Sequence, residues 1–225
     1  MGTAVQIADL CKTYKLGTVD VEVLKNINLV IDDGEFVSIM GPSGSGKSTL
    51  LYLIGGLDKP TSGSVKIKGK ELSTMKDRDE SLMRRRGIGF VFQFYNLIPN
   101  LNVEENIMLP ILLDGKKMKA YKHKLDELLD IVGLSDRRHH TPRELSGGQQ
   151  QRVAIARALI NEPDIILADE PIGNLDSKSG TEIMKLLQRI NMEKGKTVIQ
   201  VTHAREAAEY GNRIINVKDG RVDNQ

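Results

Sequence analysis

The sequence has one cysteine, almost no net charge and no long apolar run, and each absence narrows what the chain can be. The single cysteine, Cys11, has no partner for an internal disulfide, which is typical of a reducing cytosol; its simplest interpretation is a small buried strand residue. Lys+Arg at 32 against Asp+Glu at 30 leave a net charge of +2, so the strongly basic character of nucleic-acid-binding proteins is missing. No apolar run approaches the roughly 18 residues that cross a bilayer, and charged residues come too early at the N-terminus for a signal peptide. We therefore expect a chain that works on the soluble side of a membrane.

What the sequence does contain is enough for a substantial core. Its 225 residues, 40% of them apolar, fit one large or two small domains. Residues 60–72 have the pattern of an exposed hairpin, and apolar residues recur at helical spacing between 102 and 132. Elsewhere strand-like runs alternate with helical patterns, which predicts an α/β fold with a mostly parallel, covered sheet. The predicted strands are 5–7, 21–24, 36–40, 87–93, 165–169 and 197–202.

Residues 41–48, GPSGSGKS, match the phosphate-loop pattern G-x-x-x-x-G-K-[S/T]. The motif follows a predicted strand and begins a predicted helix. Glycines let consecutive backbone N–H groups point at phosphate oxygens, and the helix N-terminus adds its positive end. Lys47 is then placed to reach the β- and γ-phosphates, and the Ser48 hydroxyl to bind Mg²⁺. A glycine-rich turn that binds nothing is the alternative, but the context favours a nucleotide site.

Two acids, Asp169 and Glu170, follow the apolar run 165–168. Ligands of open parallel sheets bind at the carboxyl ends of the strands. Successive strand side chains point to opposite faces, so the two acids should have separate tasks. We expect Asp169 on the metal side and Glu170 as the general base that polarises an attacking water. Alone, such a pair is more simply a strand meeting solvent; the phosphate loop in the same chain reverses that preference.

Residues 145–152, LSGGQQQR, predict a second helix N-terminus. Taken with residues 41–48 and 165–170, this segment resembles the signature of ATP-binding-cassette (ABC) ATPases, and the resemblance covers essentially the whole chain. It implies one ABC ATPase domain, residues 1–225, with the P-loop NTPase fold. That fold would have an N-terminal antiparallel β subdomain, a mostly parallel core sheet, and a helical subdomain at roughly 96–160.

The resemblance also implies roles for single residues. Tyr14 would stack on adenine, although a core strand tyrosine is the alternative interpretation. Gln93 would contact Mg²⁺ and the water, and His203 would contact the γ-phosphate; without the resemblance, His203 would be a structural histidine. The implied catalytic residues are Glu170, His203, Gln93 and Lys47, and the implied metal ligands are Ser48, Gln93 and Asp169. The implied nucleotide-binding residues are Tyr14, Gly41, Pro42, Ser43, Gly44, Ser45, Gly46, Lys47, Ser48 and Thr49. The residues implied to reach the nucleotide of a second subunit are Ser146, Gly147, Gly148, Gln149 and Asp176.

The implied cofactors are ATP and Mg²⁺, and the implied partners are proteins. Two such chains close head to tail in the family, so a second copy or a close relative is required. An integral-membrane permease would contact the chain near Gln93 and the helical subdomain, holding it at the cytoplasmic face of the cell membrane. Segments 34–51, 88–110, 144–159 and 163–171 resemble the lipoprotein-releasing and macrolide-exporting (LolD-like and MacB-like) group.

Other functions for the same machinery remain open at this point. An FtsE-like ATPase would regulate an external enzyme mechanically and transport nothing. A DNA-repair or translation ATPase is disfavoured, because the chain has neither a long coiled-coil insertion nor a second cassette. Ile172 and Phe94 depart from the family pattern and leave the coupling to the partner open.

Two clusters have simpler interpretations. The basic runs 84–86 and 116–124 have acids close by, which favours solvated helix faces over a nucleic-acid or lipid site. His139 and His140 have no further metal ligands at suitable spacing, so we predict no zinc site there.

Overall fold

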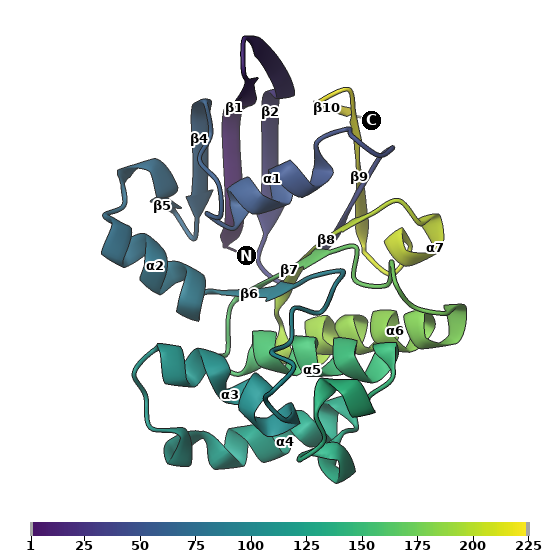
Figure 1. Cartoon of the computed structure of the whole chain (residues 1–225). Helices are drawn as coiled ribbons and strands as arrows, with labels where there is room; N and C mark the ends of the chain where they lie inside the picture. The colour runs from purple at the N-terminus through teal and green to yellow at the C-terminus, as the bar shows by residue number, and fades with distance from the viewer. Residues whose placement is uncertain (1, 224–225) are drawn as a thin grey trace.

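The computed structural model describes residues 2–223 and builds them around two β-sheets (Figure 1). The first sheet is antiparallel, in the order β2-β1-β4-β5, and the second has the order β10-β9-β3-β8-β7-β6. Strands β9, β3, β8, β7 and β6 run parallel, and β10 is antiparallel to β9. The strands of the first sheet are β1 Thr3–Leu16, β2 Val19–Asp32, β4 Ser62–Ile67 and β5 Lys70–Glu71. Those of the second are β3 Phe36–Met40, β6 Ile88–Val91, β7 Ile165–Asp169, β8 Thr197–Thr202, β9 Arg213–Lys218 and β10 Arg221–Asp223.

Apolar strands form the centre of the second sheet because helices and the first sheet cover both of its faces. Every residue of β7 and β8 is buried, as expected for parallel strands between two layers. The predicted α/β fold with a mostly parallel sheet and an N-terminal antiparallel sheet is thus confirmed. The predicted hairpin at 60–72 is present as β4 and β5, but it is not wholly exposed: β4 pairs with β1, and its Val65 and Ile67 are buried.

The helices divide between the two faces of the second sheet (Figure 1). Helix α1 lies between the sheets, and its leucines share a core with residues of β1, β2, β3 and β8. Helices α3, α4, α5 and α6 share the other core, which includes Phe36, Val91 and Ile166 of the sheet. The α-helices are α1 Lys47–Ile54, α2 Asp77–Arg86, α3 Val103–Leu113, α4 Lys122–Val132, α5 Gly147–Leu159, α6 Ser177–Lys194 and α7 Arg205–Ala208. Short 3-10 helices span Leu72–Thr74, Met118–Tyr121, Ser135–Arg137 and Pro142–Glu144.

The segment 102–132 is helical, as its pattern predicts. Asn102 caps α3 in a capping box with Glu105. One turn later the fully buried Asn106 donates to the carbonyl groups of Ile98, Leu101 and Asn102 and accepts from the Ile98 N–H. This single side chain therefore holds the loop before α3 against the helix.

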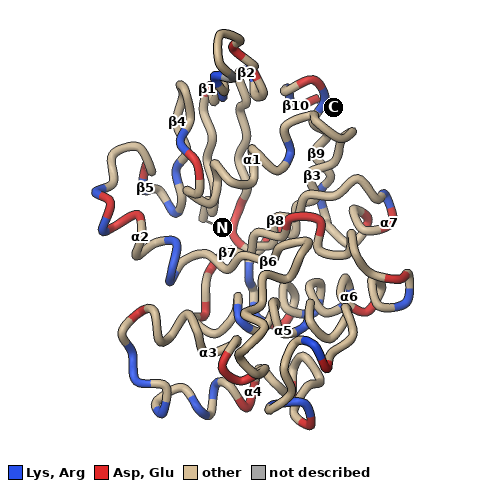
Figure 2. The backbone as a smooth tube through the Cα atoms, in the orientation of Figure 1, with Lys and Arg blue, Asp and Glu red and all other residues tan. Residues whose placement is uncertain are grey.

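Figure 2 shows positive and negative residues scattered over the helices and strands. The basic runs are partly solvated, as predicted, but one acid also pairs with cations from both of them. Asp114, whose side chain is 1% exposed, pairs with Arg85 and Arg86 of α2 and with Lys116. These pairs hold the pKa of Asp114 below its usual range, chiefly through the hydrogen bond from Arg86. Asp114 therefore ties α2 to the end of α3. Between residues 2 and 223, no helix combines the length and apolar character required to cross a bilayer.

Candidate functional site

The carboxyl ends of β3, β7 and β8 bring three predicted segments to one edge of the sheet. The phosphate loop follows β3, Asp169 and Glu170 stand at the end of β7, and His203 follows β8. These strands are neighbours, with β8 between β3 and β7. Residues that are more than 100 positions apart in the sequence therefore lie together where ligands of open parallel sheets bind.

The phosphate loop leads directly into α1, which begins at Lys47 as predicted. The Lys47 ammonium is nearly buried and donates to the Pro42 carbonyl at 2.8 Å. The Ser45 hydroxyl is buried and has no hydrogen-bond partner among the described residues. Gly41 leaves no room for a side chain, because a Cβ there would lie 2.0 Å from the Val217 carbonyl oxygen. The loop thus presents a cation, an unpartnered hydroxyl and a helix N-terminus, a combination suited to phosphate.

The two acids at the end of β7 contact different partners. The Ser48 hydroxyl donates to Asp169 Oδ1 at 2.8 Å, and the Tyr52 phenol donates to Asp169 Oδ2 at 2.6 Å. Burial and this bond to Asp169 raise the pKa of Tyr52 to about 12, so near neutral pH the phenol keeps its proton and acts as the donor. Ser48 and Asp169 together supply the hard oxygen donors that Mg²⁺ prefers.

Glu170 points to a different partner. Its Oε1 lies 2.9 Å from Nδ1 of His203, whose side chain is 65% exposed. The Glu170 N–H still bonds to the Val201 carbonyl at 3.0 Å, but its φ of 47° turns the chain away from the sheet. Left-handed backbone at a non-glycine residue costs on the order of 1–2 kcal/mol and is typical of functional sites. The Glu170 carboxylate and the His203 imidazole are thus within hydrogen-bond distance at the open edge of the site.

Tyr14 stands apart, in a small polar cluster beside the phosphate loop. Its phenol donates to Asp58 Oδ2 at 2.6 Å, while the Lys12 ammonium donates to Asp58 Oδ1 at 2.7 Å and lies 4.6 Å from the Tyr14 ring centroid. Partial burial, then the bond to Asp58, raises the pKa of Tyr14. Tyr14 is 37% exposed, so it is not the core strand tyrosine of the alternative interpretation. One face of the ring meets a cation, and the stacking role stays a prediction.

The predicted second helix N-terminus is present in α5. Ser146 is its N-cap: the Ser146 hydroxyl accepts from the Gln149 N–H at 3.3 Å, and Gln149 Oε1 accepts from the Ser146 N–H at 2.9 Å. Gly147 and Gly148 form the first turn. Within residues 2–223 no hydrogen bond joins 146–149 to the phosphate loop, so the chain does not bring these two predicted halves together.

Gln93 and Asp176 lie on loops beside this edge of the sheet. Gln93 Nε2 lies 3.4 Å from Asn174 Oδ1, and the Asn174 amide donates to the Gln93 carbonyl at 3.0 Å. In the described part of the chain Gln93 makes no hydrogen bond to Ser48 or Asp169. Asp176 caps α6 by accepting from the Ser179 N–H at 3.0 Å, and hydrogen bonds with Ser179 lower the pKa of Asp176.

Sequence reasoning missed three residues that touch this site. Tyr52 contacts Asp169, and Asn174 holds Gln93. The buried Gln151 of α5 donates to the Pro171 carbonyl at 2.6 Å and the Phe92 carbonyl at 3.4 Å, so it connects α5 to the loops after β7 and β6. The available signal for Tyr52 was its position four residues after Ser48, which places both side chains on one face of α1.

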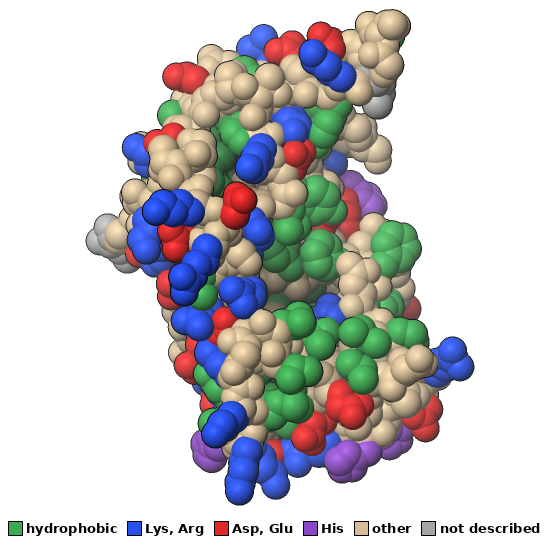
Figure 3. Space-filling model, turned by 60° about the vertical axis from the view of Figure 1, so that its left-hand side comes forward, with side chains coloured by type: hydrophobic (Ala, Val, Ile, Leu, Met, Phe, Trp, Pro, Cys, Tyr) green, Lys and Arg blue, Asp and Glu red, His purple; other side chains and the backbone are tan. Residues whose placement is uncertain are grey.

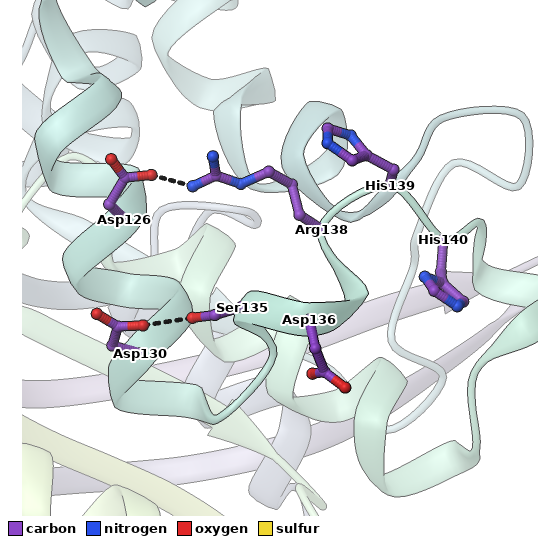
Figure 4. A pocket seen from close by; sticks show the side chains of 7 residues that line it. All are labelled: Asp126, Asp130, Ser135, Asp136, Arg138, His139 and His140. Carbon is purple, nitrogen blue, oxygen red and sulfur yellow. Dashed lines mark hydrogen bonds and ion pairs between the residues drawn. The ribbon is translucent and has the colours of Figure 1, made fainter.

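A second group of polar residues lines a pocket between α4 and the loop before α5 (Figure 4). In it Arg138 pairs with Asp126, and the Ser135 hydroxyl donates to Asp130. His139 and His140 lie at its rim. Across residues 2–223 no three His, Cys, Asp or Glu side chains are arranged to hold a metal ion. The Arg138 guanidinium of this pocket is already paired with Asp126.

The fold and the site define a P-loop nucleotide hydrolase, and comparison with known proteins gives its family. The model of the ABC transporter family matches residues 24–173. An ABC transporter ATP-binding protein of Thermotoga maritima is 52% identical over 223 residues, 99% of this chain and 95% of the relative. The macrolide export ATP-binding/permease protein MacB of Brucella melitensis is 49% identical over 97% of this chain, which spans 34% of that protein.

A solved structure agrees with these relatives. The ATP-binding cassette MJ0796 of Methanocaldococcus jannaschii, in a dimeric post-hydrolysis state with ADP and Pi, has a TM-score of 0.89 and 50% identity; the match covers 98% of this chain and 97% of that one. The chain therefore belongs to the ABC transporter family. It is an ATPase whose cofactors are ATP and Mg²⁺, as its sequence predicts.

Proposed function

We propose that this chain hydrolyses ATP at the edge formed by β3, β7 and β8 and so drives a membrane permease. One observation carries the proposal: Asp169 meets Ser48 at 2.8 Å on one side of the strand end, while Glu170 meets His203 at 2.9 Å on the other. The first pair has the donors for Mg²⁺, which supplies charge neutralisation at the phosphates when bound. The second pair has a proton acceptor at an open position.

Each remaining step is assigned to a side chain of this protein. Lys47 and the N-terminus of α1 neutralise the phosphate oxygens. The Glu170 carboxylate takes a proton from the water that attacks the γ-phosphorus, and His203 orients that carboxylate and reaches the γ-phosphate. ADP leaves as the bond from the γ-phosphorus to the bridging oxygen breaks, which yields inorganic phosphate. We also assign Tyr14 to the adenine and Gln93 to the metal and the attacking water.

We further propose that two copies, or this chain and a close relative, close head to tail. Residues 146–149 form a capped helix N-terminus suited to an anion, yet they make no hydrogen bond to the phosphate loop within residues 2–223. A second subunit gives them a phosphate to contact, and Asp176 would join them there. The dimeric structure of MJ0796 with ADP and Pi supports this arrangement.

The permease would dock in a groove beside Gln93, where α2, β6, α3 and α5 meet. Figure 3 shows hydrophobic side chains around a hollow on this face of the molecule. Phe90, Leu109 and Leu113 line the groove, whose cavity volume is about 340 Å³, and Arg157 crosses it to donate to the Tyr95 and Asn96 carbonyls. Arg157 thereby links the groove to the loop that follows Gln93. Here the permease would contact both the loop of Gln93 and the helical subdomain, which we place at roughly 96–160.

The permease type that we propose belongs to lipoprotein release or to macrolide or peptide export. The MacB relative supports it, because that protein carries ATP-binding and permease functions together and this chain matches a third of it. Through such a permease the chain would sit at the cytoplasmic face of the cell membrane. We keep mechanical regulation of an external enzyme as the alternative outcome, separable by whether the co-purifying permease moves a substrate.

The substitution Glu170→Gln tests the hydrolytic assignment. The amide keeps the size of the side chain but cannot accept a proton, so we expect turnover to fall by about 10² or more while ATP binding persists and an ATP-dependent dimer accumulates. Steady-state phosphate release, labelled-nucleotide binding and light scattering measure the three effects. Glu193→Gln, at an exposed position of α6, is the matched control. Near-normal hydrolysis in Glu170→Gln would reassign the base, and a variant that stays monomeric with ATP would refute the head-to-tail dimer.

A further inference from the structure

Tyr52 contacts Asp169, a predicted metal ligand, and has no role in the mechanism above. It lies in α1 four residues after Ser48, so the Ser48 hydroxyl and the Tyr52 phenol project from one face of the helix, one turn apart. Both reach across to β7 and donate to the same carboxylate: Ser48 to Asp169 Oδ1 at 2.8 Å, and Tyr52 to Asp169 Oδ2 at 2.6 Å. Both carboxylate oxygens of Asp169 therefore accept hydrogen bonds from the same helix, α1.

The two bonds have different consequences for the carboxylate. The bond from Ser48 joins two groups that both serve as metal ligands. The bond from Tyr52 comes from a group outside the ligand set and occupies the other oxygen, which fixes the plane of the carboxylate. Asp169 is 9% exposed, so little water is available to replace a missing donor. In known metal sites the hydrogen-bond partners of ligating carboxylates orient those ligands and are worth 10- to 100-fold in metal affinity or activity.

We infer that Tyr52 is a positioning residue for the metal. Its hydroxyl holds the Asp169 carboxylate so that Oδ1 faces the Ser48 hydroxyl, and Asp169 Oδ1 and the Ser48 hydroxyl oxygen can then both bind Mg²⁺. This inference rests on the proposed metal role of Ser48 and Asp169. Without the phenol, the buried Oδ2 has lost its donor, and the carboxylate turns further onto the Ser48 hydroxyl to compensate. The two ligands then bind each other at the expense of the metal. Tyr52 thus acts on Mg²⁺ through Asp169 and touches neither the metal nor the phosphates.

Tyr52→Phe removes the hydroxyl and keeps the ring, so it isolates the bond to Asp169. The probe is a fluorescent ATP analogue with a β–γ imido bridge, titrated into the whole chain in EDTA and again in Mg²⁺. We expect its affinity in EDTA to match that of the unsubstituted protein, and the gain in affinity from Mg²⁺ to shrink about tenfold. The Mg²⁺ concentration for half-maximal ATP hydrolysis should rise by a similar factor.

Two further variants keep the result interpretable. Tyr210→Phe removes a phenol that makes no hydrogen bond within residues 2–223, and it should leave both affinities unchanged. Asp169→Asn should abolish most of the Mg²⁺ gain; if it does not, the proposed metal role of Asp169 fails. If Asp169→Asn loses the gain but Tyr52→Phe keeps it, Tyr52 is a packing residue and only this inference is overturned. An equal loss of affinity in EDTA and in Mg²⁺ for Tyr52→Phe would overturn it as well, because the effect would not be specific to the metal.

Discussion

The first residue of the phosphate loop gives the sharpest test of how tightly the fold constrains the nucleotide site. A Cβ at Gly41 would lie 2.0 Å from the Val217 carbonyl oxygen and 2.8 Å from the Ser45 hydroxyl oxygen. The carbonyl belongs to β9, whose Asn216 is paired with Met40 of β3, directly before the loop. Gly41→Ala therefore forces the loop and β9 apart by about 1 Å, against the ladder that joins them.

We expect Gly41→Ala to destabilise the chain by about 3 kcal/mol, the upper end of the overpacking range, because a backbone atom cannot rotate out of the way. For a chain of this size that lowers the melting temperature by roughly 6–12 °C. Gly44 is the matched control in the same loop: its φ is +79°, but a Cβ there would meet no described atom within 4 Å. Gly44→Ala carries only left-handed strain of about 1 kcal/mol, partly offset by the smaller entropy of the unfolded chain.

Urea unfolding measures the two free energies, and binding of labelled ATP measures the functional consequence. Since Gly41 sets the path of the loop into α1, a displacement of this size should also weaken ATP binding by at least tenfold. Each variant adds one methyl group to the unsubstituted protein, so the difference between their unfolding free energies isolates the clash at Gly41. If Gly41→Ala unfolds within about 1 kcal/mol of Gly44→Ala, the close approach to Val217 is not a real constraint and the reasoning is refuted.

Two further predictions concern the groove and the loop beside it. Leu113→Asp puts a charge on a groove side chain that is 65% exposed, so it should leave the ATPase activity of the isolated chain intact but abolish co-purification with a permease. Met192→Asp, at a position of α6 that is 76% exposed, is the control. An equal loss of co-purification in both variants would contradict the docking site. Asn106→Leu leaves the Leu101 carbonyl and the Ile98 N–H without their partner, while the Ile98 and Asn102 carbonyls keep their backbone donors. The loss should cost about 3 kcal/mol in urea unfolding, and a cost below 1 kcal/mol would mean that water replaces the side chain.

Local sequence patterns were sufficient for the elements that carry the site. The predicted strands 36–40, 165–169 and 197–202 match β3, β7 and β8 residue for residue, because each is an apolar run with a change of chemistry at its ends. The start of α1 at Lys47 and the cap of α5 at Ser146 could also be predicted from local signals, since glycine and serine mark those positions. The predicted strand 87–93 is shorter in the structure: β6 is Ile88–Val91, and its pairing with β7 ends at Val91 and Ala168.

Contacts between distant segments could not be predicted in the same way. Tyr52 lies in an apolar helical run whose spacing indicates core packing, and nothing within α1 shows that its hydroxyl meets a carboxylate 117 positions later. In the sequence, Asp114 is one of the acids that offset the basic runs on the surface. The packing of α3 beside α2 instead buries its side chain among three cations. Asn106 is polar in a helix whose neighbours are apolar, and its partners lie in an irregular loop. Each depends on packing direction, which local periodicity does not encode.

The contrast between Asp169 and Glu170 shows how one strand end produces two chemical environments. Asp169 is the last residue of β7, 9% exposed, and both of its oxygens face α1. Glu170 stands one position later, beyond the end of β7, where its φ is 47°; its side chain meets His203, and its N–H still bonds to the Val201 carbonyl. The backbone of both acids is thus fixed by the sheet. A metal-side acid and a proton acceptor can therefore be adjacent in sequence without competing for one partner, because β7 ends between them and the left-handed backbone of Glu170 sends its side chain in another direction.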